Sequence, residues 1–299
     1  MSTQPIRHIV AHVNDAKVSR EVLLLGVTLA RQHDASLTAV MGVEQVIPSA
    51  YVNATTAAMA QQLLEEHLSA LRLQVEAMLA QLEAETGCAV RLQIAHGEAV
   101  PVLKAQAQVA DLLLVGQRDP EGAGGMDRTG AANLMMDAGC PMVCVPHIGW
   151  PRPQGGGAAE RVLVAWSPTS ESARALRDAL PLLARARHVE LIMFVDGDTV
   201  SDQAAKAQLE PVREHLARHG VKAELVVRQS REPSLGERLR RGWIPDVSVA
   251  EALLSHAADM NADLIVMGGY GHSRAWQAVL GGVTRSMLET MTVPVLFSH

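Results

Sequence analysis

The sequence predicts an α/β protein made of two tandem Rossmann-like units, each a five-stranded parallel sheet with helices on both faces. Short apolar runs alternate with helical patterns along the chain, which is typical of parallel sheets covered by helices. Strand motifs also recur at an offset of 152 or 153 residues. ADLLLVG at 110–116 returns as ADLIVMG at 262–268, and IVA at 9–11 returns as VLV at 162–164.

The second half shows the pattern most clearly. Strands are expected at 162–165, 190–195, 222–228, 264–267 and 293–297, and helices at 170–186, 204–218, 247–260 and 283–291. The first half follows the same order, with one longer helix across residues 55–86. A Pro/Gly segment, Trp150–Gly157, separates the halves. We therefore expect domains at 1–150 and 158–299, packed as a pseudo-two-fold pair through the final strands at 141–145 and 293–297.

Composition limits the function classes. The 299 residues are 48% apolar and 19% charged, and no apolar run approaches the roughly 20 residues of a membrane span. The N-terminus lacks a signal-peptide pattern, and three cysteines form no disulfide framework. The net charge of −6 lies in the first half, and neither half carries a nucleic-acid footprint. We expect a cytoplasmic protein that binds neither membranes nor nucleic acids.

A glycine-rich loop lies after the fourth strand of the second half, where Gly268, Gly271 and Gly281 separate a strand from a helix start. Ligands of parallel sheets bind beyond the carboxyl ends of the strands. Glycine lets the backbone approach a ligand closely, and a helix N-terminus presents N–H groups to an anion. The loop therefore favours phosphate, although glycines that only make tight turns are the alternative. It matches neither a Walker A motif nor the GxGxxG of dinucleotide enzymes.

The spacing glycine, two residues, glycine, nine residues, glycine resembles the ATP-binding motif of universal stress proteins. The strands VLVA, DLIVMG and VPVLF resemble those of the same family. The resemblance covers the whole chain as two units and is stronger in the second half. It implies ATP or another adenine nucleotide as ligand, with Mg²⁺ as an option, and no catalytic residues. The implied site residues are Ala165, Trp166, Ser167, Val195, Gly268, Gly271, His272, Gly281, Gly282, Val283 and Thr284.

Two positions depart from the family pattern. The family usually has an Asp near the adenine at the end of the first strand, where this chain has Ser167 and, in the first half, Asn14. The hydroxyl residue that follows the third motif glycine is replaced by Gly282, and Thr284 is the nearest hydroxyl. These departures weaken base recognition and remove one contact to the terminal phosphate.

The matching loop of the first half is degenerate. Asp119 stands at the second motif glycine, and Glu121 and Asp127 add negative charge that would repel a polyphosphate. The third glycine is displaced to Gly130 and is followed by alanine. We expect this unit to be a structural partner and the chain to bind at most one nucleotide.

Other candidate sites are weaker. Cys140, Cys144 and His147 could suggest a metal, but Cys144 falls within a strand, and no metal site is expected. His272 beside Ser273 lacks the third group of a nucleophilic site. The segment 230–245 is longer than its first-half counterpart and brings Arg238, Arg240, Arg241 and Trp243 to the ligand edge. It is a lid over the site, a partner surface or a solvated loop.

Two functions from different classes follow. The resemblance implies a non-enzymatic, adenine-nucleotide-binding stress-response protein that acts through nucleotide-sensitive association, most simply as a homodimer. The alternative is a nucleotide-independent interaction scaffold of the same fold. An enzyme of the adenine-nucleotide α-hydrolase type would need catalytic groups that the sequence does not display.

Overall fold

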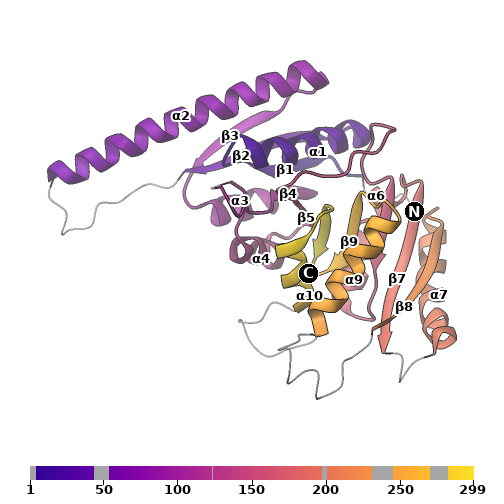
Figure 1. Cartoon of the computed structure of the whole chain (residues 1–299). Helices are drawn as coiled ribbons and strands as arrows, with labels where there is room; N and C mark the ends of the chain where they lie inside the picture. Colours follow the sequence, from indigo (N-terminus) through magenta and orange to yellow (C-terminus); the bar gives the residue numbers. More distant parts are fainter. Residues whose placement is uncertain (1–4, 44–53, 123, 197–200, 231–244, 270–281) are drawn as a thin grey trace.

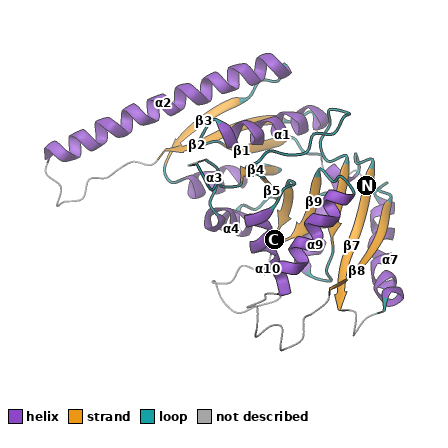
Figure 2. Cartoon of the chain, viewed as in Figure 1, coloured by secondary structure: helices purple, strands orange, loops and turns teal. Residues whose placement is uncertain are grey.

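The computed structural model describes residues 5–43, 54–122, 124–196, 201–230, 245–269 and 282–299. These residues form one ten-stranded sheet with helices on both faces (Figures 1 and 2). The α/β class and the tandem arrangement predicted from the sequence are confirmed.

The helices and strands follow the predicted order in both units. The first unit comprises β1 (His8–His12), α1 (Lys17–His33), β2 (Ser36–Val43), α2 (Ala54–Thr86), β3 (Arg91–His96), α3 (Ala99–Ala107), β4 (Leu112–Gly116), α4 (Arg128–Asp137) and β5 (Met142–Val145). The second comprises β6 (Arg161–Ala165), α5 (Ser170–Asp178), α6 (Leu180–Leu183), β7 (His188–Asp196), α7 (Asp202–Arg218), β8 (Ala223–Ser230), α9 (Pro245–Asp259), β9 (Leu264–Gly268), α10 (Gly282–Thr290) and β10 (Val295–Ser298).

One predicted helix is divided in two. The pattern over 170–186 predicted a continuous helix, but α5 ends at Asp178 and α6 begins at Leu180. Pro181 explains the break, because it has no N–H to donate to the carbonyl four residues earlier and its ring crowds that carbonyl.

The two units share one sheet through their last strands. The strand order is β3-β2-β1-β4-β5-β10-β9-β6-β7-β8, with parallel neighbours inside each unit. At the centre, β5 and β10 are antiparallel and pair Cys144 with Val295 and Met142 with Phe297. The predicted pairing of the final strands is confirmed. Because this pair is antiparallel, the carboxyl ends of the two sets of strands face opposite edges of the sheet.

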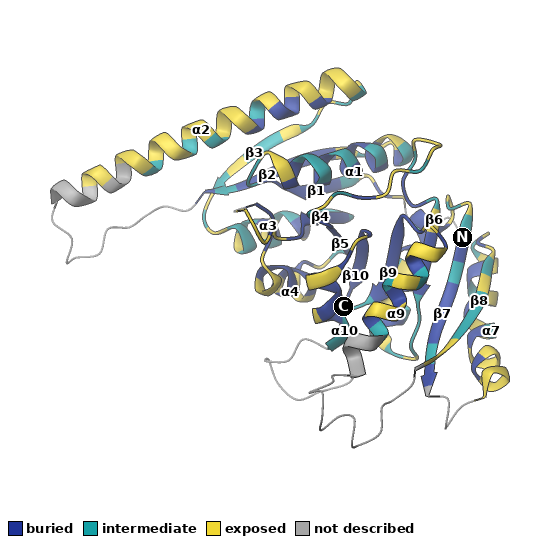
Figure 3. Ribbon diagram, in the orientation of Figure 1, coloured by how far each residue is buried: buried dark blue, intermediate teal, exposed yellow. Residues whose placement is uncertain are grey.

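Alternating side chains of the strands build a core on each face of the sheet (Figure 3). One core joins strand residues such as Ile9 and Val164 to α1, α2, α5, α6 and α7. The other joins Val10 and Leu163 to α3, α4, α9 and α10. Both cores cross the boundary between the units, so the units are packed together as well as hydrogen-bonded.

Helix α2 differs from the rest. Its 33 residues span about 50 Å, and it extends past the sheet it covers (Figure 1). Side chains of its second half are buried against the first unit, namely Val75, Met78, Leu79 and Leu82, whereas Met59, Leu63 and Leu73 are exposed. No helix among the described residues combines the length and the apolar character that crossing a membrane requires.

A repeated aspartate ties the first strand of each unit to the fourth. Asp111 Oδ2 accepts from the backbone N–H groups of residues 7 and 8 at 2.8 and 2.9 Å. Asp263 accepts from those of residues 160 and 161 at 2.9 and 2.7 Å. Burial raises the pKa of Asp263, although these backbone hydrogen bonds oppose that shift. The aspartates of the two ADL motifs are therefore structural.

The buried His12 predicts a pH dependence of stability. It ends β1 with 3% of its surface exposed, and burial lowers its pKa from 6.5 to about 4. The unfolded chain takes up this proton below pH 6.5, whereas the folded chain does so only near pH 4. The free energy of unfolding should be highest above pH 6.5 and fall by about 3 kcal/mol as the pH drops to 4.

Chemical denaturation between pH 4 and 7 measures this slope. His12→Gln, which cannot titrate, should reduce it, whereas His67→Gln on the exposed face of α2 should leave it unchanged. Part of the slope should remain in His12→Gln, because burial also lowers the pKa of His33 to about 4. Equal slopes in wild type and His12→Gln would show that another group controls acid stability.

Candidate functional site

The carboxyl ends of the second unit's strands bring together several residues of the predicted site. Ala165 is the last residue of β6, and Trp166 and Ser167 follow it. Val195 lies near the end of β7, and Gly268 is the last residue of β9. Residues 282–284 form the first turn of α10. Gly271, His272, Gly281 and the four residues of the proposed lid lie outside the described residues. The described residues therefore form the rim of the predicted site.

Ser167 is held at the start of α5. Its hydroxyl lies 2.9 Å from Ser172 Oγ, and its N–H donates to the same oxygen at 3.4 Å. Thr169 completes the cluster as the N-cap, accepting from Ser172 N–H at 3.2 Å. Ser167 thus offers a neutral hydroxyl where the family usually has a carboxylate.

The two residues before Ser167 have structural contacts. Trp166 N–H donates to the carbonyl of Ile192 at 2.8 Å, which continues the β6–β7 ladder, and its side chain packs against the core on the α5 face. Ala165 packs against the opposite core. Ligand contacts from these two residues would therefore have to come from backbone carbonyls or from the exposed part of the indole.

Gly268 is required for helix packing. A Cβ at this position would lie 2.6 Å from the backbone nitrogen of Ser172 and 2.7 Å from the carbonyl carbon of Glu171. Gly116, its equivalent in the first unit, would place a Cβ 2.3 Å from Val18 Cγ1. In both units the glycine lets the helix after the first strand approach the fourth strand. The first motif glycine is thus explained by structure even where the loop is degenerate.

Gly282 replaces the hydroxyl residue of the motif, and the nearby Thr284 does not place an exposed hydroxyl at the surface in its stead. Thr284 is 3% exposed, so its side chain is enclosed by protein within α10. Gly282 and Val283, which precede it, are half-buried. Residues 282–284 therefore offer a phosphate their backbone N–H groups and no exposed side-chain hydroxyl.

The first unit's loop covers its own strand ends. Asn14, the counterpart of Ser167, makes a reciprocal pair with Gly125: Asn14 Nδ2 donates to Gly125 O at 2.9 Å, and Gly125 N–H donates to Asn14 Oδ1 at 3.0 Å. Gly125 adopts a φ of +82°, and a Cβ there would lie 2.3 Å from the carbonyl oxygen of Gln117. A side chain of the same edge thus binds the loop where a ligand would approach.

An ion pair holds the same loop from the other side. Lys17 Nζ lies 2.7 Å from Asp119 Oδ2, and the Asp119 side chain is only 7% exposed. The hydrogen bond from Lys17 is the largest influence that lowers the pKa of Asp119, and it raises the pKa of Lys17. Asp119 Oδ1 also accepts from the N–H of Glu121 at 3.0 Å.

These contacts give the acidic residues a different role from the predicted one. The sequence suggested that Asp119, Glu121 and Asp127 oppose an anion by charge alone. Asp119 instead pairs with Lys17, and Asp127 caps α4 by accepting from the N–H of Gly130 at 3.0 Å. The loop is folded by its own carboxylates.

The units also complete each other's edges. Gln117 Nε2 donates to the carbonyl of Leu288 in α10 at 3.0 Å, and its Oε1 accepts from His147 N–H at 3.2 Å. At the equivalent position of the second unit, a Cβ on Gly269 would lie 2.3 Å from Met135 Sδ in α4. Each ligand edge is therefore bordered by a helix of the other unit.

Cys140, Cys144 and His147 are not brought together as a group of possible metal ligands among the described residues. Cys144 is buried within β5, and burial raises the pKa of its thiol strongly. Burial also raises the pKa of Cys140 to about 12. His147 faces Gln117, with Nδ1 3.0 Å from its amide oxygen. Neutral thiols in these positions are poor metal ligands.

Two hydrogen-bonded contacts at these edges were not predicted from the sequence. One is the serine of the first helix, Ser19 or Ser172, which accepts from the N–H of the residue after the first strand. The other is the Asn14–Gly125 pair. The 153-residue offset between Ser19 and Ser172 could have revealed the first, but the second joins distant residues and has no local signal.

Comparison with known proteins agrees with this architecture. A sequence profile of the Universal stress protein family matches residues 5–146 and again 159–299. The structure of a universal stress protein from Archaeoglobus fulgidus DSM 4304 is similar, with a TM-score of 0.65 and 16% identity over 97% of both chains. A protein of unknown function from Pseudomonas aeruginosa PAO1 has a TM-score of 0.57 and 14% identity over 98% of this chain and 92% of that one.

No curated protein matches the chain. At such low identity the two solved structures support the fold alone, whereas the profile matches nearly every residue of both halves. The chain belongs to the Universal stress protein family, as two family units in tandem.

Proposed function

We propose that the protein is a non-enzymatic stress-response protein whose second unit binds one adenine nucleotide and whose association with partners depends on that nucleotide. The observation that carries the proposal is the spacing of Gly268, Gly271 and Gly281 between the end of β9 and the start of α10. Glycines at this spacing would let the backbone approach a phosphate closely, and the start of α10 would add its positive dipole end. Family membership supplies the expected ligand class.

The rim residues fit phosphates better than they fit a specific base. Ser167 provides a hydroxyl in place of a carboxylate, and the enclosed Thr284 does not replace the lost phosphate contact. Losing one charge-assisted hydrogen bond costs roughly 1.5–3 kcal/mol, which is about one or two orders of magnitude in affinity. ATP should therefore bind little better than ADP or AMP, and bound Mg²⁺ would have to be held mainly by the nucleotide.

The lid and the homodimer are further parts of the proposal. Arg238, Arg240, Arg241 and Trp243 carry the charge and ring that suit a phosphate and a base. The final strands cannot pair with another chain because they pair with each other, so a homodimer would use β3, β8 or the helical faces. The expected cytoplasmic location likewise stays a prediction.

A nucleotide-independent scaffold is the second candidate. The closed loop of the first unit favours it, since Asn14 and Asp119 are already occupied by contacts of the protein itself. On this reading the first unit's site is purely structural, and the second unit would likewise fold and act without a ligand.

Ligand released from the denatured, purified protein distinguishes the two candidates. We expect mass spectrometry to detect an adenine nucleotide, and Gly271→Asp to abolish it by placing a carboxylate beside the phosphates. Ala70→Asp is the control, because it adds the same carboxylate at an exposed position of α2 in the first unit. A nucleotide-free wild type that also fails to bind added ATP would favour the scaffold.

The first unit's loop should loosen when its ion pair is removed. Asp119→Ala removes the partner of Lys17 and the acceptor for Glu121 N–H, so amide exchange over residues 117–126 should become faster. Asp34→Ala is the control, because Asp34 pairs with Arg7 at 2.9 Å but is 98% exposed. Hydrogen exchange followed by mass spectrometry compares the variants. Unchanged exchange in Asp119→Ala would mean that the Asn14–Gly125 pair alone closes the loop.

A further inference from the structure

Four polar residues gather on one face of the second unit, far along the strands from the glycine loop. His188 and Glu190 are two residues apart near the start of β7, and Glu224 on β8 is in register with Glu190. Side chains of strand residues two apart share a face. His256 of α9 contacts Glu190 from above this face. The group therefore lies toward the amino ends of the strands, opposite the proposed nucleotide edge.

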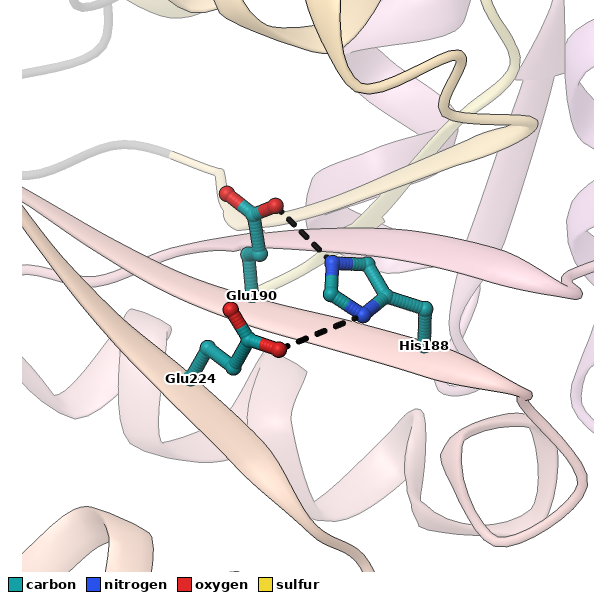
Figure 4. Close-up of side chains that lie close together, drawn as sticks. All are labelled: His188, Glu190 and Glu224. Carbon is teal, nitrogen blue, oxygen red and sulfur yellow. Dashed lines mark hydrogen bonds and ion pairs between the residues drawn. The ribbon is translucent and has the colours of Figure 1, made fainter.

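The imidazole of His188 lies between two carboxylates (Figure 4). Its Nε2 is 2.9 Å from Glu190 Oε1, and its Nδ1 is 3.7 Å from Glu224 Oε1. A neutral imidazole carries one N–H and can donate to only one of them. The other carboxylate then faces a lone pair. A positive charge at this point, either a second proton or a metal ion, would satisfy both.

Contacts from His256 and Arg228 orient the carboxylate of Glu190. His256 Nε2 lies 2.7 Å from Glu190 Oε2, and the guanidinium of Arg228 lies 3.4 Å from His256 Nδ1. Arginine can only donate, so His256 Nδ1 accepts and its Nε2–H donates to Glu190. Glu190 is therefore oriented through both of its oxygens, by His188 at Oε1 and by His256 at Oε2.

We propose that His188, Glu190 and Glu224 bind a divalent transition-metal ion of the zinc class, with His256 positioning Glu190. Each of the three residues offers one ligand atom, and these atoms all lie within 4.8 Å of one another. Bonds of about 2.0–2.2 Å to nitrogen and oxygen place tetrahedral ligands about 3.4 Å apart. The pair at 2.9 Å must therefore open, and any pair near the 4.8 Å limit must close by roughly 1.4 Å. Glu224 can supply that movement because its side chain is 73% exposed.

The chemistry of the donors favours zinc over the alkaline-earth ions. Imidazole suits zinc, cobalt, nickel and copper, whereas magnesium prefers oxygen ligands alone. Water would fill the fourth position.

The site would fasten the edge of the sheet. Strand β8 is the last strand of the second unit and is hydrogen-bonded only on its β7 side among the described strands. A metal ion held by residues of both strands would stabilise this edge, and the melting temperature would keep rising as the free metal concentration exceeds its Kd. This role is independent of the nucleotide proposed for the opposite edge.

Titration of the full chain with ZnCl₂ by calorimetry tests the proposal. We expect one Zn²⁺ per chain. His188→Gln should reduce the affinity more than 10-fold, and Glu224→Gln, at an exposed position that should not affect folding, should reduce it about 10-fold. His256→Gln should weaken binding by about 10–100-fold, as loss of an outer-shell partner does. MgCl₂ should give no site that depends on His188.

Two controls exclude other zinc ligands. His215 in α7 and His219 after it have ring centroids 4.8 Å apart and are an alternative pair of zinc ligands. If zinc binds at His188 instead, His215→Gln should keep the full Zn²⁺ affinity. Substitution with Co²⁺ should give a d–d spectrum without a thiolate charge-transfer band, because no cysteine takes part. The proposal is overturned if the wild type binds no Zn²⁺, if Glu224→Gln and His188→Gln bind it as tightly as the wild type, or if the thiolate band appears.

Discussion

The antiparallel pair of β5 and β10 is the constraint on which the rest of the structure depends. An unpaired final strand at the edge of each unit would be a template for association with another chain. Here the two strands satisfy each other, and the side chains on both faces continue the two cores without a break. The interface that two separate units could form between their last strands therefore lies inside one chain. The outer strands of the sheet are β3 and β8.

This pairing also explains why the two ligand edges can diverge. Antiparallel strands send the carboxyl ends of the two units to opposite edges, and each edge is bordered by a helix of the other unit. Gln117 reaches α10, whereas the equivalent Gly269 leaves room for Met135 of α4. Closing the first unit's loop on Asn14 and Lys17 therefore adds to a rigid seam, and the second unit can keep its glycine loop for a ligand. In the function proposed here, the first unit supports the structure and the second binds the ligand.

The fold could be predicted from the sequence because each strand motif of the first half recurs in the second half. ADLLLVG and ADLIVMG marked the fourth strands, and the aspartates in them proved to be structural clamps. The break at Ala179 was missed because helical periodicity outweighed Pro181. The site was predictable only as far as spacing reaches. Gly268 had a packing role that no spacing reveals, and the bond from Lys17 to Asp119 joins residues 102 apart. The His188 group was missed because its members come from β7, β8 and α9.

If the first unit's site is filled by its own side chains and the second unit's site takes a ligand, the chain should bind one nucleotide. Native mass spectrometry of the intact chain with excess ATP resolves species with zero, one and two ligands. We expect a single bound nucleotide per chain at saturation, lost in Gly271→Asp and kept in Asp119→Ala. Two nucleotides per chain, or one that survives Gly271→Asp, would contradict this prediction.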